Sequence, residues 1–232
     1  MLRSLNNLEN FKISASDGII GRVRDFYFDD GRWIIRYLVA DTEGFWHAPH
    51  QVLVSPNAFR QAEWNTREFH LALTVDNVRN SPGVDFAKPV SRQLEEDFSQ
   101  YHGWPTWWSE RPGEPDYGDP NLRSAREVVG YPITATGDGI GHVEDFIVDD
   151  ETWTIRYLVV DTSNWLPGKK VLLAPLWVDR ISWAEHEVTV GLPVEAIRNS
   201  PEWRPEQPVN RDYESRLYDY YGRPAYWIDE RK

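Results

Sequence analysis

The chain has 232 residues, no cysteine and a formal net charge of -12, because 37 aspartates and glutamates outnumber 25 lysines and arginines. An acidic chain without a basic cluster lacks the surface on which binding to nucleic acids and anionic lipids depends, so we expect no direct nucleic-acid binding. The lack of cysteine excludes disulfides and thiol chemistry, and no stretch reaches the roughly 18 apolar residues of a membrane span, so we expect a cytoplasmic protein.

Two runs typical of β-strands follow residue 20. The run "GRVRDFYFDD" (21–30) is rich in valine and aromatic residues, and "WIIRYLVADT" (33–42) comes next. Asp29, Asp30 and Gly31 supply turn residues between the runs, which predicts a hairpin. Both faces of the second run are largely apolar. A strand covered on both sides favours a closed or strongly coiled sheet.

Two further strands and a helix are predicted downstream. "QVLVS" (51–55) and "EFHLALT" (68–74) have strand composition. The segment "VSRQLEEDFSQYHG" (90–103) carries apolar residues at helical spacing, with Ser91 as its N-cap and Gly103 as its end. After this helix the sequence becomes dense in proline, glycine and acidic residues, as expected of a surface linker.

The second half of the chain repeats the first. At an offset of 120, residues 21–42 match 141–162 at 14 of 22 positions, and after one deletion the offset is 119. The second copy ends in a matching helix, "VNRDYESRLYDYYG" (209–222), with Asn210 as its cap and Gly222 as its end. The repeat predicts two domains with helical tails, which are 1–112 and 122–232, joined by a linker at 113–121.

Tryptophan is abundant, with 12 residues. Six form three repeated pairs, which repetition assigns to the shared core: Trp33/Trp153, Trp64/Trp183 and Trp108/Trp227. The other six are candidates for contact between the copies or for a partner surface, where tryptophan is enriched. They are Trp46, Trp104, Trp107, Trp165, Trp177 and Trp203. For Trp104 and Trp107 the alternative is that they pack the helical tail on its own sheet.

The repeated aspartates are candidates for chemistry. They are Asp25, Asp29, Asp30 and Asp41, with Asp145, Asp149, Asp150 and Asp161 in the second copy. Paired carboxylates can bind a cation or carry out hydrolysis. Aspartate in a hairpin turn also hydrogen-bonds its own backbone, and we expect this structural role for the repeated set.

Two further pairs of residues are candidate sites. His47 and His50 lack the additional ligands of a metal site, so no metal is expected there. Arg36 and Arg156 lie in mid-strand among apolar neighbours, where we expect internal salt bridges. No nucleophile arrangement or phosphate-binding loop stands out, so we expect neither an enzyme nor a bound cofactor.

The segment "DGIGHVEDFIVDDETWTIRYLVVDT" followed by "VLLAP", and its partner in the first half, resemble PRC-barrel domains over 8–82 and 127–201. The resemblance implies a small β-barrel like those in the cytoplasmic part of the photosynthetic reaction-centre H subunit and in the ribosome-maturation factor RimM. It also raises a proton path along the repeated carboxylates as a minor alternative. The membrane helix of the H subunit and the separate N-terminal domain of RimM have no counterpart in this sequence.

We therefore expect a mainly β protein of two tandem PRC-type barrels, each with a helical tail, packed with pseudo-twofold symmetry. The expected function is a non-enzymatic cytoplasmic binding or scaffold protein that contacts another protein or a macromolecular complex. One alternative is a regulatory or assembly subunit at a membrane complex resembling a photosynthetic reaction centre. A second alternative is a RimM-like accessory factor for ribosome or RNA processing. Self-association is left open.

Overall fold

The computed structural model describes residues 1–42, 51–82, 92–104, 122–136, 138–162 and 169–229. The chain divides into two compact units. The first unit is Leu8–Arg126, and the second unit combines Met1–Asn7 with Glu127–Lys232. This differs from the expected domains, because each unit includes a short segment that the sequence repeat assigns to the other copy. The expected linker, 113–121, lies outside the described residues.

The first unit is built on one sheet. Its strands are β2 (Lys12–Ser14), β3 (Ile19–Asp29), β4 (Ile34–Asp41), β5 (Gln51–Val54), β6 (Phe59–Glu63), β7 (Glu68–Leu71) and β8 (Leu122–Ser124). Their order is β5-β4-β3-β2-β7-β6, with β8 paired to β3. The helices are α2 (Val75–Arg79), α3 (Arg92–His102) and the 3-10 helix η1 (Pro56–Ala58). The strands expected at 51–55 and 68–74 and the helix expected at 90–103 are confirmed.

The second unit repeats this plan. Its strands are β1 (Leu2–Ser4), β9 (Pro132–Ala135), β10 (Asp138–Asp149), β11 (Ile155–Asp161), β12 (Lys170–Leu173), β13 (Val178–Ser182), β14 (Glu187–Val190) and β15 (Glu202–Trp203). Their order is β13-β14-β9-β10-β11-β12-β15, with β1 paired to β10. The helices are α5 (Val194–Arg198), α6 (Arg211–Tyr221), α7 (Tyr226–Asp229) and the 3-10 helix η2 (Pro175–Trp177).

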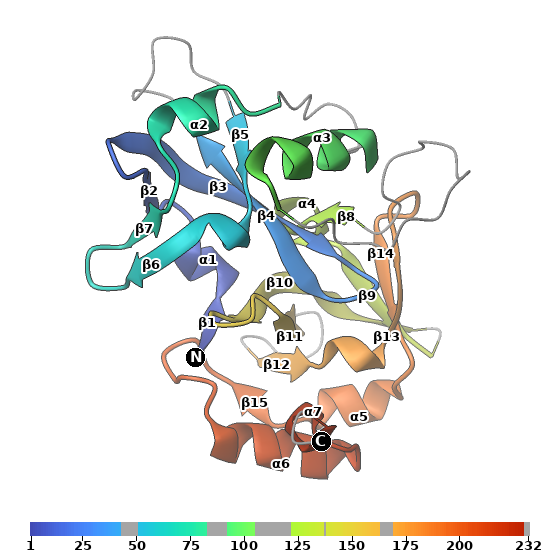
Figure 1. Cartoon of the computed structure of the whole chain (residues 1–232). Coiled ribbons are helices and arrows are strands. Elements are labelled where there is room, and N and C mark those ends of the chain that lie inside the picture. The colour runs from blue at the N-terminus through green and yellow to red at the C-terminus, as the bar shows by residue number, and fades with distance from the viewer. Residues whose placement is uncertain (43–50, 83–91, 105–121, 137, 163–168, 230–232) are drawn as a thin grey trace. The chain divides into compact units, whose positions relative to one another are not determined.

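The chain passes from one unit to the other within two very short helices. These are α1 (Leu5–Leu8) and α4 (Ala125–Val128). Each follows directly after a short strand that joins the sheet of the other copy, and we call these two strands, β1 and β8, the exchanged strands. Figure 1 shows the N-terminal strand β1 beside β10, far from it in sequence. The position of this strand is a property of the fold that the repeat alone does not reveal.

The hairpin turns use the expected aspartates. The carboxylate of Asp29 accepts hydrogen bonds from the backbone N–H groups of Gly31 and Arg32, at 2.9 and 3.0 Å. In the second unit Asp149 accepts one from Glu151, at 3.0 Å. The structural role expected for these two aspartates is therefore confirmed.

Trp33 and Trp153 close these turns in the left-handed conformation, with φ of 58° and 55°. Their backbone N–H groups donate to the carbonyls of Asp29 and Asp149, at 2.6 and 2.8 Å. The strand that follows Trp33 therefore begins only at Ile34. The run predicted as a strand begins at Trp33, but this residue belongs to the turn, because its backbone N–H completes the turn's hydrogen bond.

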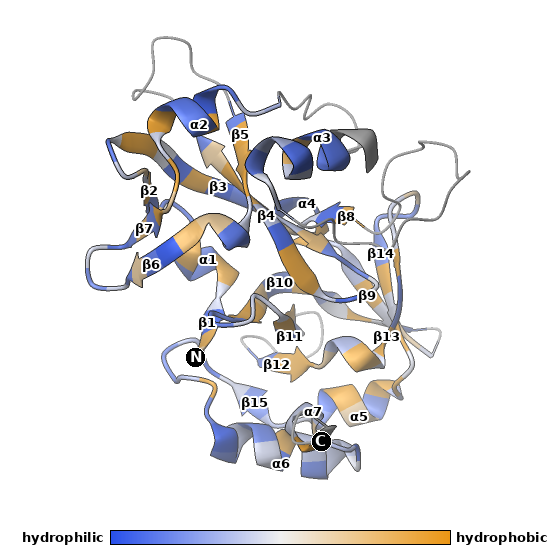
Figure 2. Cartoon of the chain, viewed as in Figure 1, coloured by the Kyte–Doolittle hydropathy of each residue, from blue (hydrophilic) through white to orange (hydrophobic). Residues whose placement is uncertain are grey.

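The core of each unit lies against its central strands. Residues 35–40 of β4 are all buried, which confirms that this strand is covered on both faces. In the first unit α3 adds Phe98 to a cluster with Tyr37, Val39 and Leu53. Figure 2 shows hydrophobic residues along β5 and hydrophilic residues over most of α3, which fits a surface helix that buries one stripe.

The second helical tail ends as its sequence predicts. The side chain of Asn210 accepts a hydrogen bond from the backbone N–H of Tyr213, at 2.9 Å, at the start of α6. Gly222 follows the helix with φ of 61°, a left-handed conformation that glycine adopts without a Cβ clash. In the first copy Gly103 follows α3 with φ of 69°, whereas the expected cap Ser91 lies outside the described residues.

The fold class is mainly β with two sheets, as expected. Closure of each sheet into a barrel and pseudo-twofold packing stay predictions. Among the described residues, no helix has the length and apolar character needed to cross a membrane.

Candidate functional site

Each unit has an aspartate that a β-bulge places beside an exchanged strand. The pairing of β3 with β4 shifts by one residue at Arg24, directly before Asp25. The pairing of β10 with β11 shifts in the same way at Glu144, directly before Asp145. Bulges re-aim the neighbouring side chain, and the two aspartates are candidates for this effect. We call the contact between this aspartate and the exchanged strand the segment site, which is Asp25 with β8 in the first unit and Asp145 with β1 in the second.

In the first unit the segment site holds β8 on β3. The strands pair antiparallel, with Tyr27 opposite Ser124. The Ser124 hydroxyl donates to one oxygen of the Asp25 carboxylate at 2.6 Å, and the backbone N–H of Arg126 donates to the other at 3.0 Å. The Arg123 guanidinium donates to Asp30 at 2.8 Å. The short strand is thus held by side chains as well as by its ladder.

In the second unit the segment site holds β1 on β10. The strands pair antiparallel, with Ser4 opposite Ile147. The Ser4 hydroxyl donates to the Asp145 carboxylate, and the backbone N–H of Asn6 donates to its other oxygen at 3.1 Å. The Arg3 guanidinium donates to Asp150. The three contacts described for the first segment site therefore each have an equivalent here.

The sequence contains a signal for this site, which lies outside the repeated ranges 21–42 and 141–162. Residues 2–4 and 122–124 are both Leu-Arg-Ser, at the same offset of 120 as the rest of the repeat. A purely local role was expected for the repeated aspartates. For Asp25 and Asp145, and for Asp30 and Asp150, that expectation is incomplete, because these carboxylates bind the segment that carries Leu-Arg-Ser.

The two segment sites differ in their electrostatic surroundings. Burial raises the pKa of Asp145 from 3.8 to about 6, against the hydrogen bonds from Ser4, Phe146 and Asn6, and the charge of Glu144 raises it further. Burial also raises the pKa of Asp25, where the Arg126 cation acts in the opposite direction.

The sequence positions explain the difference. Asn6 and Glu144 in the second site correspond to Arg126 and Arg24 in the first. The same hydrogen bonds are thus set among basic residues in one unit and beside an acidic residue in the other.

A buried ion pair fixes the helical tail in the first unit. Arg36 and Glu95 are 2% and 1% exposed, and the guanidinium lies 2.8 Å from the carboxylate. Asp29 contributes a second carboxylate at 3.4 Å from Arg36. The salt bridge expected for Arg36 is confirmed. Because Glu95 belongs to α3 and Arg36 to β4, this pair ties the helix to the sheet.

The second unit uses the same positions differently. Arg156 lies 3.7 Å from Asp149, which confirms a salt bridge, and its guanidinium stacks over the ring of Tyr226 at 4.1 Å. Glu214, at the place of Glu95, instead accepts hydrogen bonds from the hydroxyls of Tyr157 and Tyr226, at 2.7 and 2.9 Å. In place of a buried ion pair to the sheet, the carboxylate of the tail helix here accepts from tyrosine hydroxyls and pairs with Arg211 of its own helix at 3.2 Å.

Burial of tryptophan does not follow the repeat. Trp177 and Trp203, which have no repeated counterpart, are 6% and 7% exposed. Their burial does not favour an exposed partner surface, and Trp177 packs against Tyr218 and Tyr221 of α6, whereas a contact between the copies stays a prediction. Trp183, which repetition assigned to the core, is 38% exposed, and that assignment is wrong. Trp153 is buried as expected, at 9% exposed.

Trp104 is half-buried against the tail helix. Its ring stacks on His102 at 4.4 Å and lies 5.9 Å from Phe98. This contact agrees with the alternative expected for Trp104, in which its ring helps to pack the helical tail. Three other candidates for the partner surface, Trp46, Trp107 and Trp165, lie outside the described residues, as does Trp108 of the repeated pairs.

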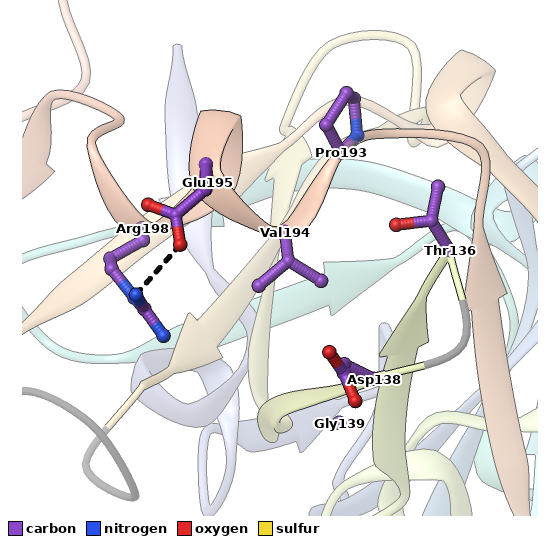
Figure 3. A pocket seen from close by; sticks show the side chains of 7 residues that line it. All are labelled: Thr136, Asp138, Gly139, Pro193, Val194, Glu195 and Arg198. Carbon is purple, nitrogen blue, oxygen red and sulfur yellow. Dashed lines mark hydrogen bonds and ion pairs between the residues drawn. The ribbon is translucent and has the colours of Figure 1, made fainter.

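A pocket of about 530 Å³ lies in the second unit, between the ends of β9 and β10 and helix α5 (Figure 3). Its lining residues are Thr136, Asp138, Gly139, Pro193, Val194, Glu195 and Arg198. Glu195 and Arg198 form an ion pair at 2.7 Å. In the first unit, Asp17 instead accepts a hydrogen bond from the backbone N–H of Val75, at 2.7 Å, at the start of α2. The carboxylates of the pocket are exposed, so a ligand there would remain in contact with water.

His47 and His50 lie outside the described residues. Over the described part of the chain, no group of three or more histidine, aspartate or glutamate residues could hold a metal ion.

Comparison with protein families assigns part of the chain. Residues 120–189 match the family model of the PRC-barrel domain. The match runs from just before β8 to β14, so it contains a strand that the structure places in the first unit. The match does not cover the barrel expected in the first copy, at 8–82. No curated protein matches the chain.

Proposed function

We propose that the chain is a non-enzymatic binding or scaffold protein whose sheets recognise extended polypeptide segments along β3 and β10. The observation that carries the proposal is the segment site, which occurs twice with equivalent contacts. Addition of a strand to a sheet is a general mode of peptide recognition, in which the ladder provides affinity and side chains provide specificity. The PRC-barrel match supports a binding role for the second copy.

The bound segments define the chemistry of a partner. Both present leucine, arginine and serine, followed by a buried apolar residue, which is Leu5 at 3% exposed or Ala125 at 4%. The arginine pairs with a carboxylate at the turn, and the serine hydroxyl and a backbone N–H bind the second carboxylate. The proposed partner is therefore another protein with an extended apolar-Arg-Ser-apolar segment.

The experiment must account for the chain's own segments. A tethered segment competes at an effective concentration on the order of millimolar. The receptor is thus the full-length chain with Arg3→Ala and Ser4→Ala, which weakens the resident segment and leaves the carboxylates of the second site in place. Circular dichroism should first show that this receptor keeps its β content.

A peptide with the sequence of residues 1–7 is then added to the isotope-labelled receptor at millimolar concentration. We expect shifts of the backbone amides of β10 by NMR. Alanine in place of the arginine and serine of the peptide should abolish them, as should Asp145→Asn with Asp150→Asn in the receptor. Absence of shifts, or equal shifts with the alanine peptide, would refute recognition of this segment.

The expected partners from photosynthetic or ribosomal complexes remain predictions about the owner of such a segment. The described residues favour neither of them. Capture experiments with the full-length chain and the Asp145→Asn variant would test each, since a partner bound through the segment site should be lost with the variant.

A further inference from the structure

The segment Met1–Asn7, when it is paired with β10 (which we call seated), encloses the carboxyl group of Asp145. Asp145 is 6% exposed. One carboxyl oxygen accepts the backbone N–H groups of Asn6 and Phe146, at 3.1 and 2.7 Å, and the other contacts the Ser4 hydroxyl. The Ser4 oxygen in turn accepts the backbone N–H of Asn7, at 3.2 Å. Two of the three groups that contact the carboxyl therefore come from the segment itself.

This geometry accommodates a protonated carboxyl without loss of a contact. A proton on the oxygen beside Ser4 would be donated to the serine oxygen, which reverses the direction of that hydrogen bond. The other carboxyl oxygen would still accept both N–H groups. Hydroxyl groups can donate and accept, so the contact between Ser4 and Asp145 persists in either protonation state.

Of the charged groups around Asp145, Glu144 favours its neutral form, whereas two cations pair with neighbouring carboxylates. Glu144 lies beside it on β10 and raises its pKa. Lys170 of β12 pairs with Glu144, and Arg3 of β1 pairs with Asp150. At the first segment site, Arg126 instead stabilises the charged form of Asp25.

We propose that the segment Met1–Asn7 seats on β10 with uptake of a proton by Asp145, so that acidification tightens this site more than the equivalent site on β3. The inference goes beyond the proposed function, because it uses only the observed contacts of the segment site and adds the regulation of that site by pH. It concerns the chain's own segment, so it holds whether or not an outside segment binds.

The direction follows from linkage. With the segment in place Asp145 has a pKa of about 6, and when the segment is released and water reaches the carboxyl, we expect a pKa near the ordinary aspartate value of 3.8. A raised pKa means that the seated state binds the proton more tightly. The stabilisation is complete below about pH 4 and is lost as the pH rises through about 6. These two values correspond to about tenfold tighter seating at pH 5 than at pH 7.5.

The test is an NMR titration of the intact chain with 13C-labelled aspartate carboxyls. Asp145→Asn and Asp25→Asn identify the two resonances. We expect Asp145 to titrate with a midpoint of about 6 and Asp25 with a lower one. Ser4→Ala with Leu5→Ala, which weakens seating, should move the Asp145 midpoint toward 3.8 while the Asp25 midpoint stays unchanged.

A matched variant tests the electrostatic cause. Asn6→Arg with Glu144→Arg copies the basic surroundings of the first site, and it should lower the Asp145 midpoint while the hydrogen bonds remain. An Asp145 midpoint in the ordinary range in the intact chain would overturn the inference, as would a midpoint that does not respond to the segment variant. Failure of an outside peptide to bind would count against the proposed function alone, because this titration uses the resident segment.

Discussion

Substitution of Glu95 by glutamine should destabilise the first unit by about 3 kcal/mol. The change keeps the shape of the side chain and removes the charge that lies 2.8 Å from the Arg36 guanidinium. Removing one partner of a buried pair leaves the other charge without compensation, at a typical cost of about 3 to 5 kcal/mol. We expect the lower end of this range, because Asp29 remains within 3.4 Å of Arg36.

The second unit provides the matched control. Glu214 occupies the equivalent position, but it accepts hydrogen bonds from the hydroxyls of Tyr157 and Tyr226. The oxygen of a glutamine can still accept from these hydroxyls. Glu214 also pairs with the exposed Arg211 at 3.2 Å, and Glu214→Gln should therefore cost about 1 kcal/mol or less, the typical contribution of an exposed ion pair.

Denaturation in urea, followed by tryptophan fluorescence and circular dichroism, measures both costs. If the two units unfold separately, Glu95→Gln should lower the midpoint of one transition and Glu214→Gln that of the other. A double variant, Glu95→Leu with Arg36→Met, should recover most of the lost stability, because an apolar pair can replace a buried ion pair. A loss below about 1 kcal/mol for Glu95→Gln would refute the view that removal of the Glu95 charge leaves the Arg36 guanidinium without compensation.

Three further predictions test the packing. Gly141→Ala should destabilise the second unit by about 2 kcal/mol or more in a thermal melt, because a Cβ would overlap the carbonyl oxygen of Asp161 and the φ of 138° disfavours other residues; an unchanged melt would contradict it. Trp177→Ala should cost about 3 to 5 kcal/mol and Trp183→Ala about 1 kcal/mol or less in chemical denaturation, since only the first is buried, and the reverse order would refute this assignment. Asn210→Ala should cost about 1 kcal/mol through loss of the α6 cap. Amide-proton exchange in the first turn of α6 should become faster, and an unchanged exchange rate would contradict the prediction.

Much of the local structure was predictable because it follows from local rules. The hairpins, the strands at 51–55 and 68–74, the end of the tail helix at Gly222 and the cap at Asn210 were all read from turn residues and periodicity. The partner of Arg36 was predictable as a class, because a buried guanidinium requires a carboxylate. Its identity as Glu95 required the position of the helix on the sheet.

Tryptophan burial could not be predicted from the repeat. Trp183 sits at a repeated position and is exposed, whereas Trp177 and Trp203 have no counterpart and are buried. A repeated residue shows that two copies share a backbone position, but its exposure depends on what the rest of each unit places over it. In the second unit the ring of Trp177 packs against Tyr218 and Tyr221 of α6, and this contact depends on where the helix lies.

By itself, the sequence determined that the chain is built twice from the same strands, turns and tail helix, since these features depend on residues close together in the chain. Only the tertiary structure decided which sheet each Leu-Arg-Ser segment joins. Both copies carry the same segment and the same pair of carboxylates, so every hydrogen bond could form with either partner. The exchange, with Ser4 bound to Asp145 and Ser124 to Asp25, depends on the path of the chain through α1 and α4, which no local pattern encodes.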